Sequence, residues 1–384
     1  MIKYSVWLQL CLGFGSSKGK IALETFDNAK NIYDADKKER KNCGVFSAKE
    51  LSKMNSTSLL EAEKIVDKCK ENGITIIAYG QKFYPFCLSV IENPPIVLYV
   101  KGKLPDFDNI PSISIVGPRK VTDFGKKAAF SLAYRLSRAG FIVVSGGALG
   151  CDTYAHAGAL KAQGITVLVM ACGLLSDYLK ENAKLRNTVA ETGCLISEYP
   201  PETDVTRYSF PVRNRIMSAL SLGTVVIEAS EKSGSLITAR HAYEQGRDVF
   251  VIPHAPHEKG FEGSNALLRD GAKPLLDTSD IFNEYIVRFP DKINIERAFS
   301  EKILPNITEK SNENIKKDIK NEKNLNETLS KEAKIVYNCI DKQKFLPEDL
   351  IGAGLSSQEL ISALTELEME FLIRALPGGM YEKC

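Results

Sequence analysis

The chain has 384 residues, of which 44% are hydrophobic and 26% charged, with a formal net charge of +2. This length suits two or three domains, and the composition is that of a globular protein and excludes a largely disordered chain. The small net charge excludes a uniformly basic surface, so any surface that binds an anion must be a local patch.

Cysteine and histidine usage gives no sign of a metal centre or a disulfide framework. The nine cysteines are scattered and include no C-x-x-C pair, which indicates reduced thiols. The close pair His254 and His257 lacks flanking ligands, so we expect no metal there. The apolar stretch VWLQLCLGF near the N-terminus precedes charged helical sequence instead of a cleavage site, and no run reaches membrane-spanning length. We expect a cytoplasmic protein that does not associate with membranes.

Residues 1–103 are typical of a small helical module, of the SAM or helix-hairpin-helix kind, followed by a lead-in to the next domain. The segment from Ser47 to Gly73 is predicted as a helix, because Ser47 and Glu50 form a capping box and Gly73 suits the end of a helix. Helical hairpin modules contact nucleic-acid phosphates in some proteins and serve only packing or docking in others, and the sequence leaves both roles open.

Residues 104–286 alternate between candidate strands and helical stretches. Most of the strands are continuous apolar runs, typical of strands buried on both faces of a parallel sheet. The candidate strands are SISIV (112–116), FIVVSG (141–146), TVLVMA (166–171), CLISEY (194–199), TVVIEA (224–229), DVFVIP (248–253) and AKPLL (272–276). Helical stretches between them predict an α/β domain with a doubly wound, mostly parallel sheet and right-handed crossovers.

The rest of the chain divides into a linker and a small domain. Residues 287–330 include a stretch rich in Asn, Lys and Glu with few large apolar residues, and we expect it to be a flexible linker. Residues 331–384 regain amphipathic helical patterns and end in LIRALPGGMYEK, which predicts a β-hairpin that turns at Pro-Gly-Gly. Helices followed by a hairpin are the outline of a winged helix, which contacts DNA or protein.

Polar and glycine residues follow the predicted strands at the edge where ligands of open parallel sheets bind. Helix N-termini would offer free N–H groups there, and arginine supplies bidentate contacts to phosphate. The candidate phosphate-binding residues are Gly117, Arg119, Lys120, Ser145, Gly146, Gly147, Lys180, Asn182, Arg213, Asn214, Arg215, Ser233, Gly234, Ser235 and Thr238.

The absence of several motifs excludes some classes of ligand. No G-x-G-x-x-G follows the first strand, and DFGKK lacks the glycine spacing and the Ser/Thr of a P-loop, so no nucleotide cofactor is expected. His156 and His241 lie in helical patterns, and Ser235 has no identifiable base, so no catalytic residue is assigned. The predicted site has cations and backbone amides without catalytic groups.

Six motifs in order along the chain resemble those of the DprA/Smf family, DNA processing protein A. The motifs are IVGPRKVTDFG, VVSGGALGCDTYAHAGAL, LISEYPP, FPVRNRIMSAL, VVIEASEKSGSLITARHAYEQGRDVFVIP and GSNALLRDGAKPL. The resemblance implies an extended Rossmann-like domain that binds single-stranded DNA, forms a homodimer and assists loading of the RecA recombinase during DNA uptake and recombination.

The family's DNA-backbone contacts are carried over onto matching positions. They are Arg119, Lys180, Arg213, Arg215 and the segment from Ser233 to Thr238. The chain departs from the usual motifs at four further positions, which are Pro118, Cys151, Leu179 and His254. Pro118 and His254 affect local geometry, and none of the four departures removes a basic residue.

Three functions from different classes are weighed. The leading one is a non-enzymatic single-strand DNA binder, in which aromatic residues stack on bases. The candidate stacking residues are Tyr178, Tyr199, Tyr208 and Phe210. The alternative is a nucleotide-processing enzyme of the phosphoribohydrolase type, but SGSLITARHA contains no carboxylate before Glu244. A protein-interaction scaffold that uses only the winged helix would leave the basic edge unexplained. For a dimer, NALLRDGAKPLL (265–276) offers apolar residues.

Overall fold

The computed structural model describes most of the chain in two compact units, Met1–Pro305 and Asn306–Cys384. The described residues are 1–178, 182–256, 258–300, 330–340, 343–356, 359–360, 363–364, 367, 372–376 and 380–383, with only the backbone of 351–353 and 374–376. The flexible linker predicted over 287–330 is wrong for residues 287–300, because Phe289, Ile293 and Ala298 are buried in the core of the first unit. Residues 301–329 lie outside the described ranges. No helix in the described ranges has the length and apolar character needed to cross a membrane.

The first unit begins with six helices, and Trp7 on the first of them is fully buried. They are α1 (Ile2–Leu12), α2 (Lys18–Phe26), α3 (Ala29–Asp34), α4 (Lys37–Asn42), α5 (Ala48–Ser56) and α6 (Leu59–Glu71). The capping box of Ser47 and Glu50 is confirmed, but the single helix predicted up to Gly73 is wrong. The helix is interrupted at Thr57, whose carbonyl accepts a hydrogen bond from the Trp7 indole at 3.1 Å. Ser58 then caps the next helix, α6.

A nine-stranded sheet forms the centre of the first unit, in the order β1-β2-β6-β5-β4-β3-β7-β8-β9. The strands are β1 (Ile74–Ala78), β2 (Val97–Gly102), β3 (Ser112–Val116), β4 (Ile142–Ser145), β5 (Thr166–Met170), β6 (Cys194–Ser197), β7 (Gly223–Val226), β8 (Asp248–Val251) and β9 (Lys273–Pro274). The segment from β6 to β9 is parallel throughout, and all seven predicted strands are confirmed. The chain therefore has the predicted doubly wound, Rossmann-like α/β fold.

Strands β1 and β2 extend this sheet and were not predicted from the sequence. They pair antiparallel with each other, and β2 pairs antiparallel with β6, with Tyr99 opposite Ser197. Because Val97 and Tyr99 of β2 pack in the same core as Trp7 and Leu195, the six-helix module and the Rossmann-like sheet share one continuous packed interior.

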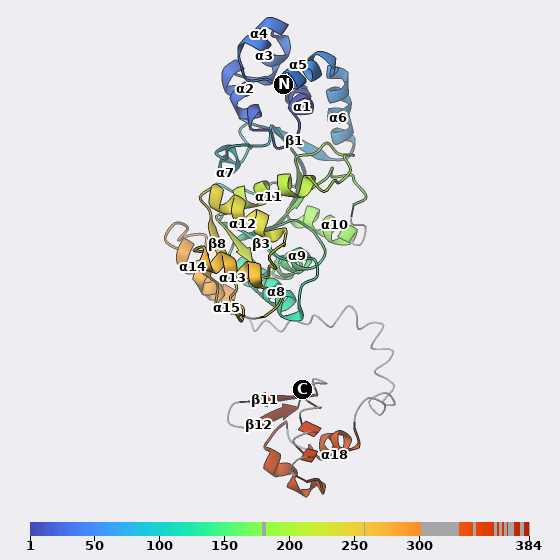
Figure 1. The fold of residues 1–384 in the computed structure, drawn as a ribbon, viewed down its shortest axis with the longest axis vertical. Coiled ribbons are helices and arrows are strands. Elements are labelled where there is room, and N and C mark those ends of the chain that lie inside the picture. The colour runs from blue at the N-terminus through green and yellow to red at the C-terminus, as the bar shows by residue number, and fades with distance from the viewer. Residues whose placement is uncertain are drawn as a thin grey trace. The chain divides into compact units, whose positions relative to one another are not determined.

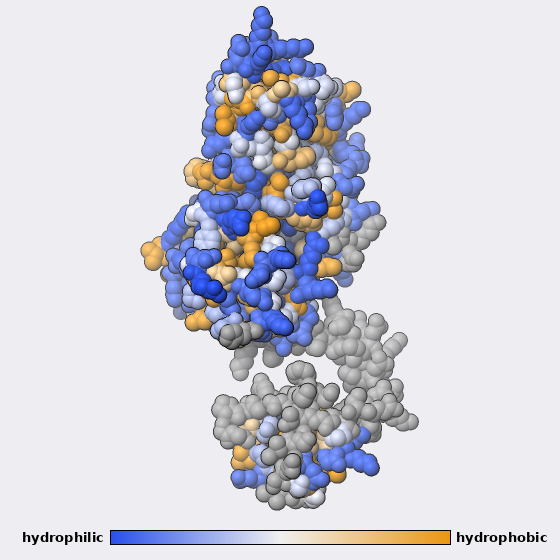
Figure 2. All heavy atoms as spheres, viewed as in Figure 1, coloured by the Kyte–Doolittle hydropathy of each residue, from blue (hydrophilic) through white to orange (hydrophobic). Residues whose placement is uncertain are grey.

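Helices cover both faces of the parallel segment (Figure 1). The helices after β2 in this unit are α8 (Asp123–Arg138), α9 (Cys151–Lys161), α10 (Ala183–Thr192), α11 (Ser209–Ala219), α12 (Ser235–Glu244), α13 (Glu262–Arg269), α14 (Thr278–Tyr285) and α15 (Ile295–Phe299), with the short α7 (Phe86–Ser89) between β1 and β2. One core holds the side chains of α8, α9 and α14, and another those of α11 and α12. On the face shown in Figure 2, the exposed hydrophobic residues of this unit lie in small groups among hydrophilic residues.

The second unit contains a three-stranded antiparallel sheet in the order β10-β12-β11. Its described elements are α18 (Lys331–Cys339), β10 (Lys344–Phe345), the 3₁₀ helix η2 (Pro347–Ala353), β11 (Ile373–Leu376) and β12 (Met380–Lys383). The two strands of the predicted hairpin pair antiparallel as β11 and β12, with Leu376 opposite Met380, and its Pro-Gly-Gly turn lies outside the described residues. The winged-helix assignment stays a prediction.

Candidate phosphate and base site

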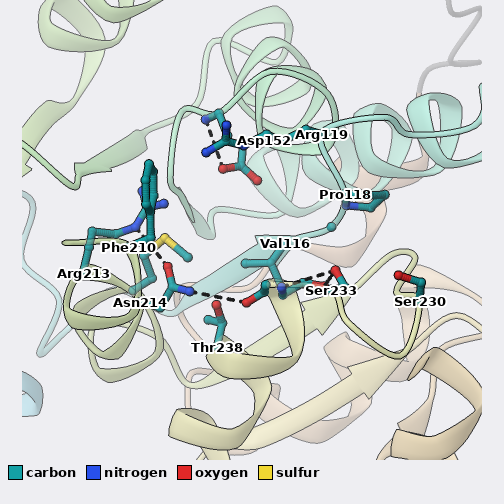
Figure 3. Close-up of a pocket in the computed structure, with 15 residues that line it drawn as sticks. Val116, Pro118, Arg119, Asp152, Phe210, Arg213, Asn214, Ser230, Ser233 and Thr238 are labelled. Carbon is teal, nitrogen blue, oxygen red and sulfur yellow. Dashed lines mark hydrogen bonds between the residues drawn. The ribbon is translucent and has the colours of Figure 1, made fainter. Parts of the chain in front are cut away.

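A cavity of about 390 Å³ opens at the carboxyl ends of β3 and β7. These neighbouring strands continue in opposite directions across the sheet, so the cavity lies at the topological switch point where open α/β sheets bind ligands. The lining residues come from four segments (Figure 3) and are Val116, Gly117, Pro118, Arg119, Ala148, Asp152, Phe210, Arg213, Asn214, Met217, Ser230, Ser233, Gly234, Ser235 and Thr238. We call this cavity the switch-point pocket.

Two close-packed turns form one wall of the pocket. The Cys151 amide donates to the Pro118 carbonyl at 3.2 Å, and a Cβ on Gly117 would approach the Cys151 sulfur to 2.7 Å. Gly150 has φ +85°, and a Cβ there would lie 2.2 Å from the Arg119 carbonyl oxygen. The turn after β3 therefore rests directly on the first turn of α9, and Pro118 and Cys151 contribute to that contact.

Arg119 projects from this turn into a cluster of aromatic side chains and is exposed. Its guanidinium donates to the Tyr178 hydroxyl at 3.1 Å and lies over the Phe210 ring, 5.1 Å from the centroid. The Tyr178 and Phe210 rings meet edge to face at 5.9 Å. An exposed cation held between half-buried rings suits a ligand that has both phosphate and base.

Arg213 and Asp152 are buried charges that brace the same pocket. Arg213 is only 6% exposed and donates to the carbonyls of Gly146, at 2.7 Å, and Val169. Burial lowers the pKa of Arg213, and the nearby Asp152 opposes that shift. Asp152 accepts from the Ala148 amide at 3.2 Å, and burial raises the pKa of its carboxyl group. Arg213 therefore holds the loop after β4 in place and has few donors left for a ligand.

The N-termini of α9 and α12 face the pocket without side-chain caps. Neither Gly150 nor Gly234, at the two N-cap positions, supplies a capping hydrogen bond. Ser233 and Ser235 share a hydroxyl hydrogen bond of 2.7 Å, and the Asn214 amide donates to the Gly234 carbonyl at 3.5 Å. The first amides of α12 already donate to Ser233 and Gly234, and the Cys151 amide of α9 donates to Pro118, so these N-termini offer an anion chiefly their partial positive charge.

Eight of the predicted residues line the switch-point pocket, and the others lie elsewhere. Gly146 and Gly147 line a smaller neighbouring cavity, to which the Asn182 side chain is tied by a 3.0 Å bond to the Gly147 carbonyl. The Ser145 hydroxyl donates to the Ile115 carbonyl at 2.7 Å inside the core. Lys120 is exposed outside the lining, and Lys180 and Leu179 lie outside the described residues.

Two sequence-based assignments do not fit the observed geometry. The Arg215 side chain is 2% exposed and pairs with Glu198 at 2.5 Å, so it cannot reach a phosphate in the pocket. Tyr199 is 5% exposed and packs against Phe14, so it offers no face to a base. Ser230, which lines the pocket, was not predicted, although it directly follows the predicted strand at 224–229.

The structure is thus a Rossmann-like α/β protein whose switch-point pocket combines an exposed arginine, aromatic rings and two helix N-termini. Residues 53–286 match the family described as DNA recombination-mediator protein A. DNA processing protein DprA of Bacillus subtilis (strain 168) is 41% identical over 221 residues, 58% of this chain and 74% of that protein. The chain belongs to the DNA recombination-mediator protein A family, whose role is to mediate recombination and not to catalyse a reaction.

Two solved structures agree with this assignment. The X-ray structure of DNA processing protein A from Streptococcus pneumoniae has a TM-score of 0.65 and 29% identity, covering 74% of this chain and 98% of that one. The protein from Helicobacter pylori, whose structure describes a single-stranded DNA binding mode, has a TM-score of 0.51 and 30% identity, covering 56% of this chain and 96% of that one.

Proposed function

We propose that this protein binds single-stranded DNA in the switch-point pocket and assists loading of RecA onto that strand. The observation that carries the proposal is Arg119, an exposed cation between Tyr178 and Phe210 at the edge where two uncapped helices begin. Phosphate would contact the arginine and the helix N-termini, and a base would stack on the rings. The family's role in recombination supports RecA as the protein that is loaded onto the strand. An assay of RecA nucleation on DNA bound by this protein measures that loading directly.

Replacing Arg119 by alanine is expected to weaken binding of oligo-dT about ten- to a hundredfold, because charged hydrogen bonds contribute about 1.5–3 kcal/mol each. Fluorescence anisotropy over a salt series, with a duplex of equal length for comparison, measures this loss. The salt dependence should also flatten, by about 0.7 in the log–log slope for each lost phosphate contact.

Arg288 supplies the matched control, because its guanidinium also lies over a phenylalanine, Phe289, at 5.2 Å, but outside the pocket lining. Arg288→Ala should bind oligo-dT like the unmodified chain. If the unmodified protein prefers the duplex, or if both variants lose affinity equally, the pocket is not the site.

The nucleotide-processing alternative gains no support from the pocket. Asp152 is the one carboxylate among the described lining residues, and it accepts hydrogen bonds from the turn that it braces. The stretch from Ser233 to Thr238 contributes hydroxyls and amides only. A phosphoribohydrolase would need an acid or base free to reach the sugar.

We also propose that the protein acts as a homodimer, joined through the groove between α12 and α13. A cavity of about 310 Å³ there is lined by Leu236, Tyr243 and Leu267, among others, and Tyr243 is 41% exposed. Tyr243→Glu is expected to shift the protein from dimer to monomer in sedimentation equilibrium, because it replaces the exposed aromatic ring of a groove that already holds Arg240 and Asp270 with a further charge. Equal molecular masses for variant and unmodified protein would contradict this interface.

A further inference from the structure

Beside the switch-point pocket, the three residues that follow β7, Ile227, Glu228 and Ala229, each hydrogen-bond to a different element. The His254 ring donates from Nε2 to the Ile227 carbonyl at 3.1 Å. Thr122 donates its amide, at 3.1 Å, and its hydroxyl to the carboxylate of Glu228, which is 2% exposed. The loop after β8 and the start of α8 are therefore fixed to the strand that forms one side of the pocket.

The next residue after Glu228, Ala229, fixes the start of α13 in the same way. Its amide donates to the Ser264 hydroxyl at 2.8 Å, and its carbonyl accepts from the Ser264 amide at 3.0 Å. Ser230 follows directly and lines the pocket, on the side opposite Phe210 (Figure 3). The elements anchored at 227–229 are thus held next to Ser230, on this side of the pocket.

Each anchored element carries one aromatic ring, and the three rings form a cluster. The His254 ring stacks on Phe261 at 4.0 Å and 15°, and Phe124 meets His254 edge to face at 6.0 Å and 83°. Phe261 is 7% exposed, whereas Phe124 is 57% exposed. Phe261 therefore supports His254 from the core, and Phe124 presents its ring to solvent.

Packing against His254 does not account for Phe124, because more than half of its surface remains in water. Lys120 and Lys127, close to it in the chain, are exposed as well, while Lys126 pairs with Asp123 at 2.6 Å. Exposed aromatic rings among exposed cations are the pattern of surfaces that track a single nucleic-acid strand. The charge is complementary to phosphate, and the ring to a base.

We propose that Phe124, with His254 beside it, is a second base-stacking subsite for single-stranded DNA that leaves the switch-point pocket past Ser230. This inference rests on the proposed function and extends it, because it gives the strand a direction across β7 towards β8. The strand would have one base at the Arg119 cluster and another, further along, on Phe124.

The test compares Phe124→Ala with Phe83→Ala by anisotropy, using an oligo-dT of about six nucleotides and one of about twenty. Phe83 is a matched control because it is 73% exposed and lies before α7, outside the pocket lining. Phe124→Ala should weaken binding of the long oligonucleotide about tenfold and leave the short one unchanged, because only a long strand reaches both subsites. Phe124→Trp should restore the long-strand affinity.

Each outcome separates the subsite from the pocket. Equal affinities of Phe124→Ala and unmodified protein for the long strand would overturn the subsite while leaving the pocket proposal standing. Equal losses for both oligonucleotides would place Phe124 inside the first site and also overturn it. Failure of the unmodified protein to bind either oligonucleotide would reject the proposed function itself. A 2-aminopurine base placed at successive positions of the long oligonucleotide would confirm the stacking if its fluorescence is quenched at one position and recovers in the Phe124→Ala variant.

Discussion

Replacing Glu198 by alanine is expected to lower the free energy of unfolding by about 3–5 kcal/mol, because it leaves a buried arginine without its counter-ion. The side chains of Glu198 and Arg215 are 4% and 2% exposed, and their carboxylate and guanidinium approach to 2.5 Å. Two further Arg215 nitrogens, Nε and Nη1, have no hydrogen-bond partner among the described residues. Arg215 thus depends heavily on this one carboxylate.

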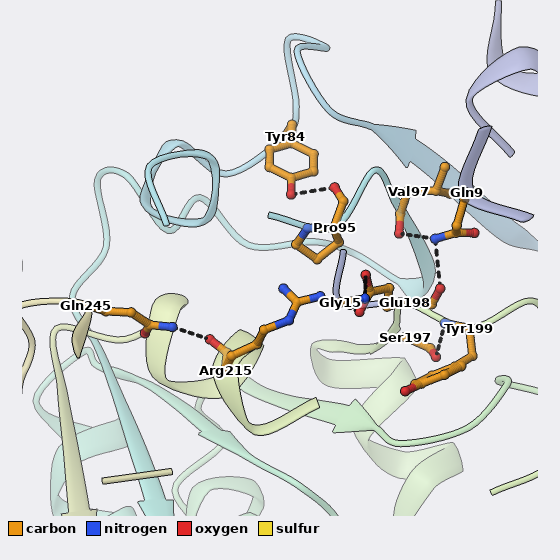
Figure 4. Close-up of polar contacts among 10 residues, drawn as sticks. All are labelled: Gln9, Gly15, Tyr84, Pro95, Val97, Ser197, Glu198, Tyr199, Arg215 and Gln245. Atoms are coloured by element: carbon orange, nitrogen blue, oxygen red, sulfur yellow. Dashed lines mark hydrogen bonds and ion pairs between the residues drawn. The ribbon is translucent and has the colours of Figure 1, made fainter. Parts of the chain in front are cut away.

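Glu198 also joins the N-terminal helices to the sheet (Figure 4). Its other carboxylate oxygen accepts from the Gly15 amide at 3.0 Å, and its carbonyl accepts from the Gln9 side chain at 2.9 Å. The Gln9 oxygen in turn accepts from the Tyr99 hydroxyl at 3.0 Å. Loss of the carboxylate should therefore loosen the helical module and α11 together.

Urea denaturation of Glu198→Ala measures the loss, and Glu202→Ala is the matched control. Glu202 pairs with Lys68 on α6, but its side chain is 67% exposed, so its removal should change stability by at most about 1 kcal/mol. The double variant Glu198→Leu/Arg215→Met should recover most of the lost stability, since an apolar pair carries no buried charge. Equal urea midpoints for the two single variants would show that the buried pair contributes no more than the exposed one.

The motif RNRIMSAL shows how far the sequence alone determines the site. It placed Arg213 and Arg215 together as phosphate contacts, yet residues two apart on a helix do not face the same side. Arg213 points to the pocket wall, and Arg215 points to Glu198. The helical spacing alone predicts that the two arginines point in different directions. The counter-ion of Arg215, however, comes from a strand end 17 residues earlier and can be identified only from the fold.

In the sheet too, some strands can be predicted from local sequence, and others depend on residues far along the chain. The parallel strands from β3 to β8 are buried almost throughout, so their composition alone identifies them, and only the two-residue β9 is partly exposed. Strand β1 is short and partly exposed, and β2 joins the sheet by antiparallel pairing with β6, whose residues lie far along the chain. The helix break at Thr57 likewise depends on Trp7, about fifty residues away, because the indole binds the carbonyl at the break.

His156 carries the second large effect, which depends on pH. It lies on α9, fully buried, with Nδ1 2.7 Å from the Thr166 hydroxyl. That hydroxyl donates to the Val143 carbonyl at 2.9 Å, so Nδ1 must be the donor to Thr166 and the proton is absent from Nε2. Nε2 is buried without a partner among the described residues. Burial, with a smaller contribution from Arg213, lowers the pKa of His156 to about 3.

Acidification should therefore destabilise the fold through His156. A histidine in an unfolded chain has a pKa of about 6.5, so between pH 6.5 and about pH 3 His156 is protonated in the unfolded chain and neutral in the folded one. The contribution of His156 is complete above pH 6.5 and is lost below it, at up to about 1.4 kcal/mol per pH unit.

Urea denaturation of the unmodified protein and His156→Asn at several pH values between 7.5 and 4.5 isolates this contribution. Asparagine keeps a donor towards Thr166 and removes the titrating ring, so the stability difference between the two proteins should shift in favour of the variant as pH falls. The control is His241→Gln on α12, since His241 is partly exposed and pairs with Glu244. A difference that stays constant from pH 7.5 to 4.5 would mean that the buried ring accepts its proton as readily as a histidine in the unfolded chain.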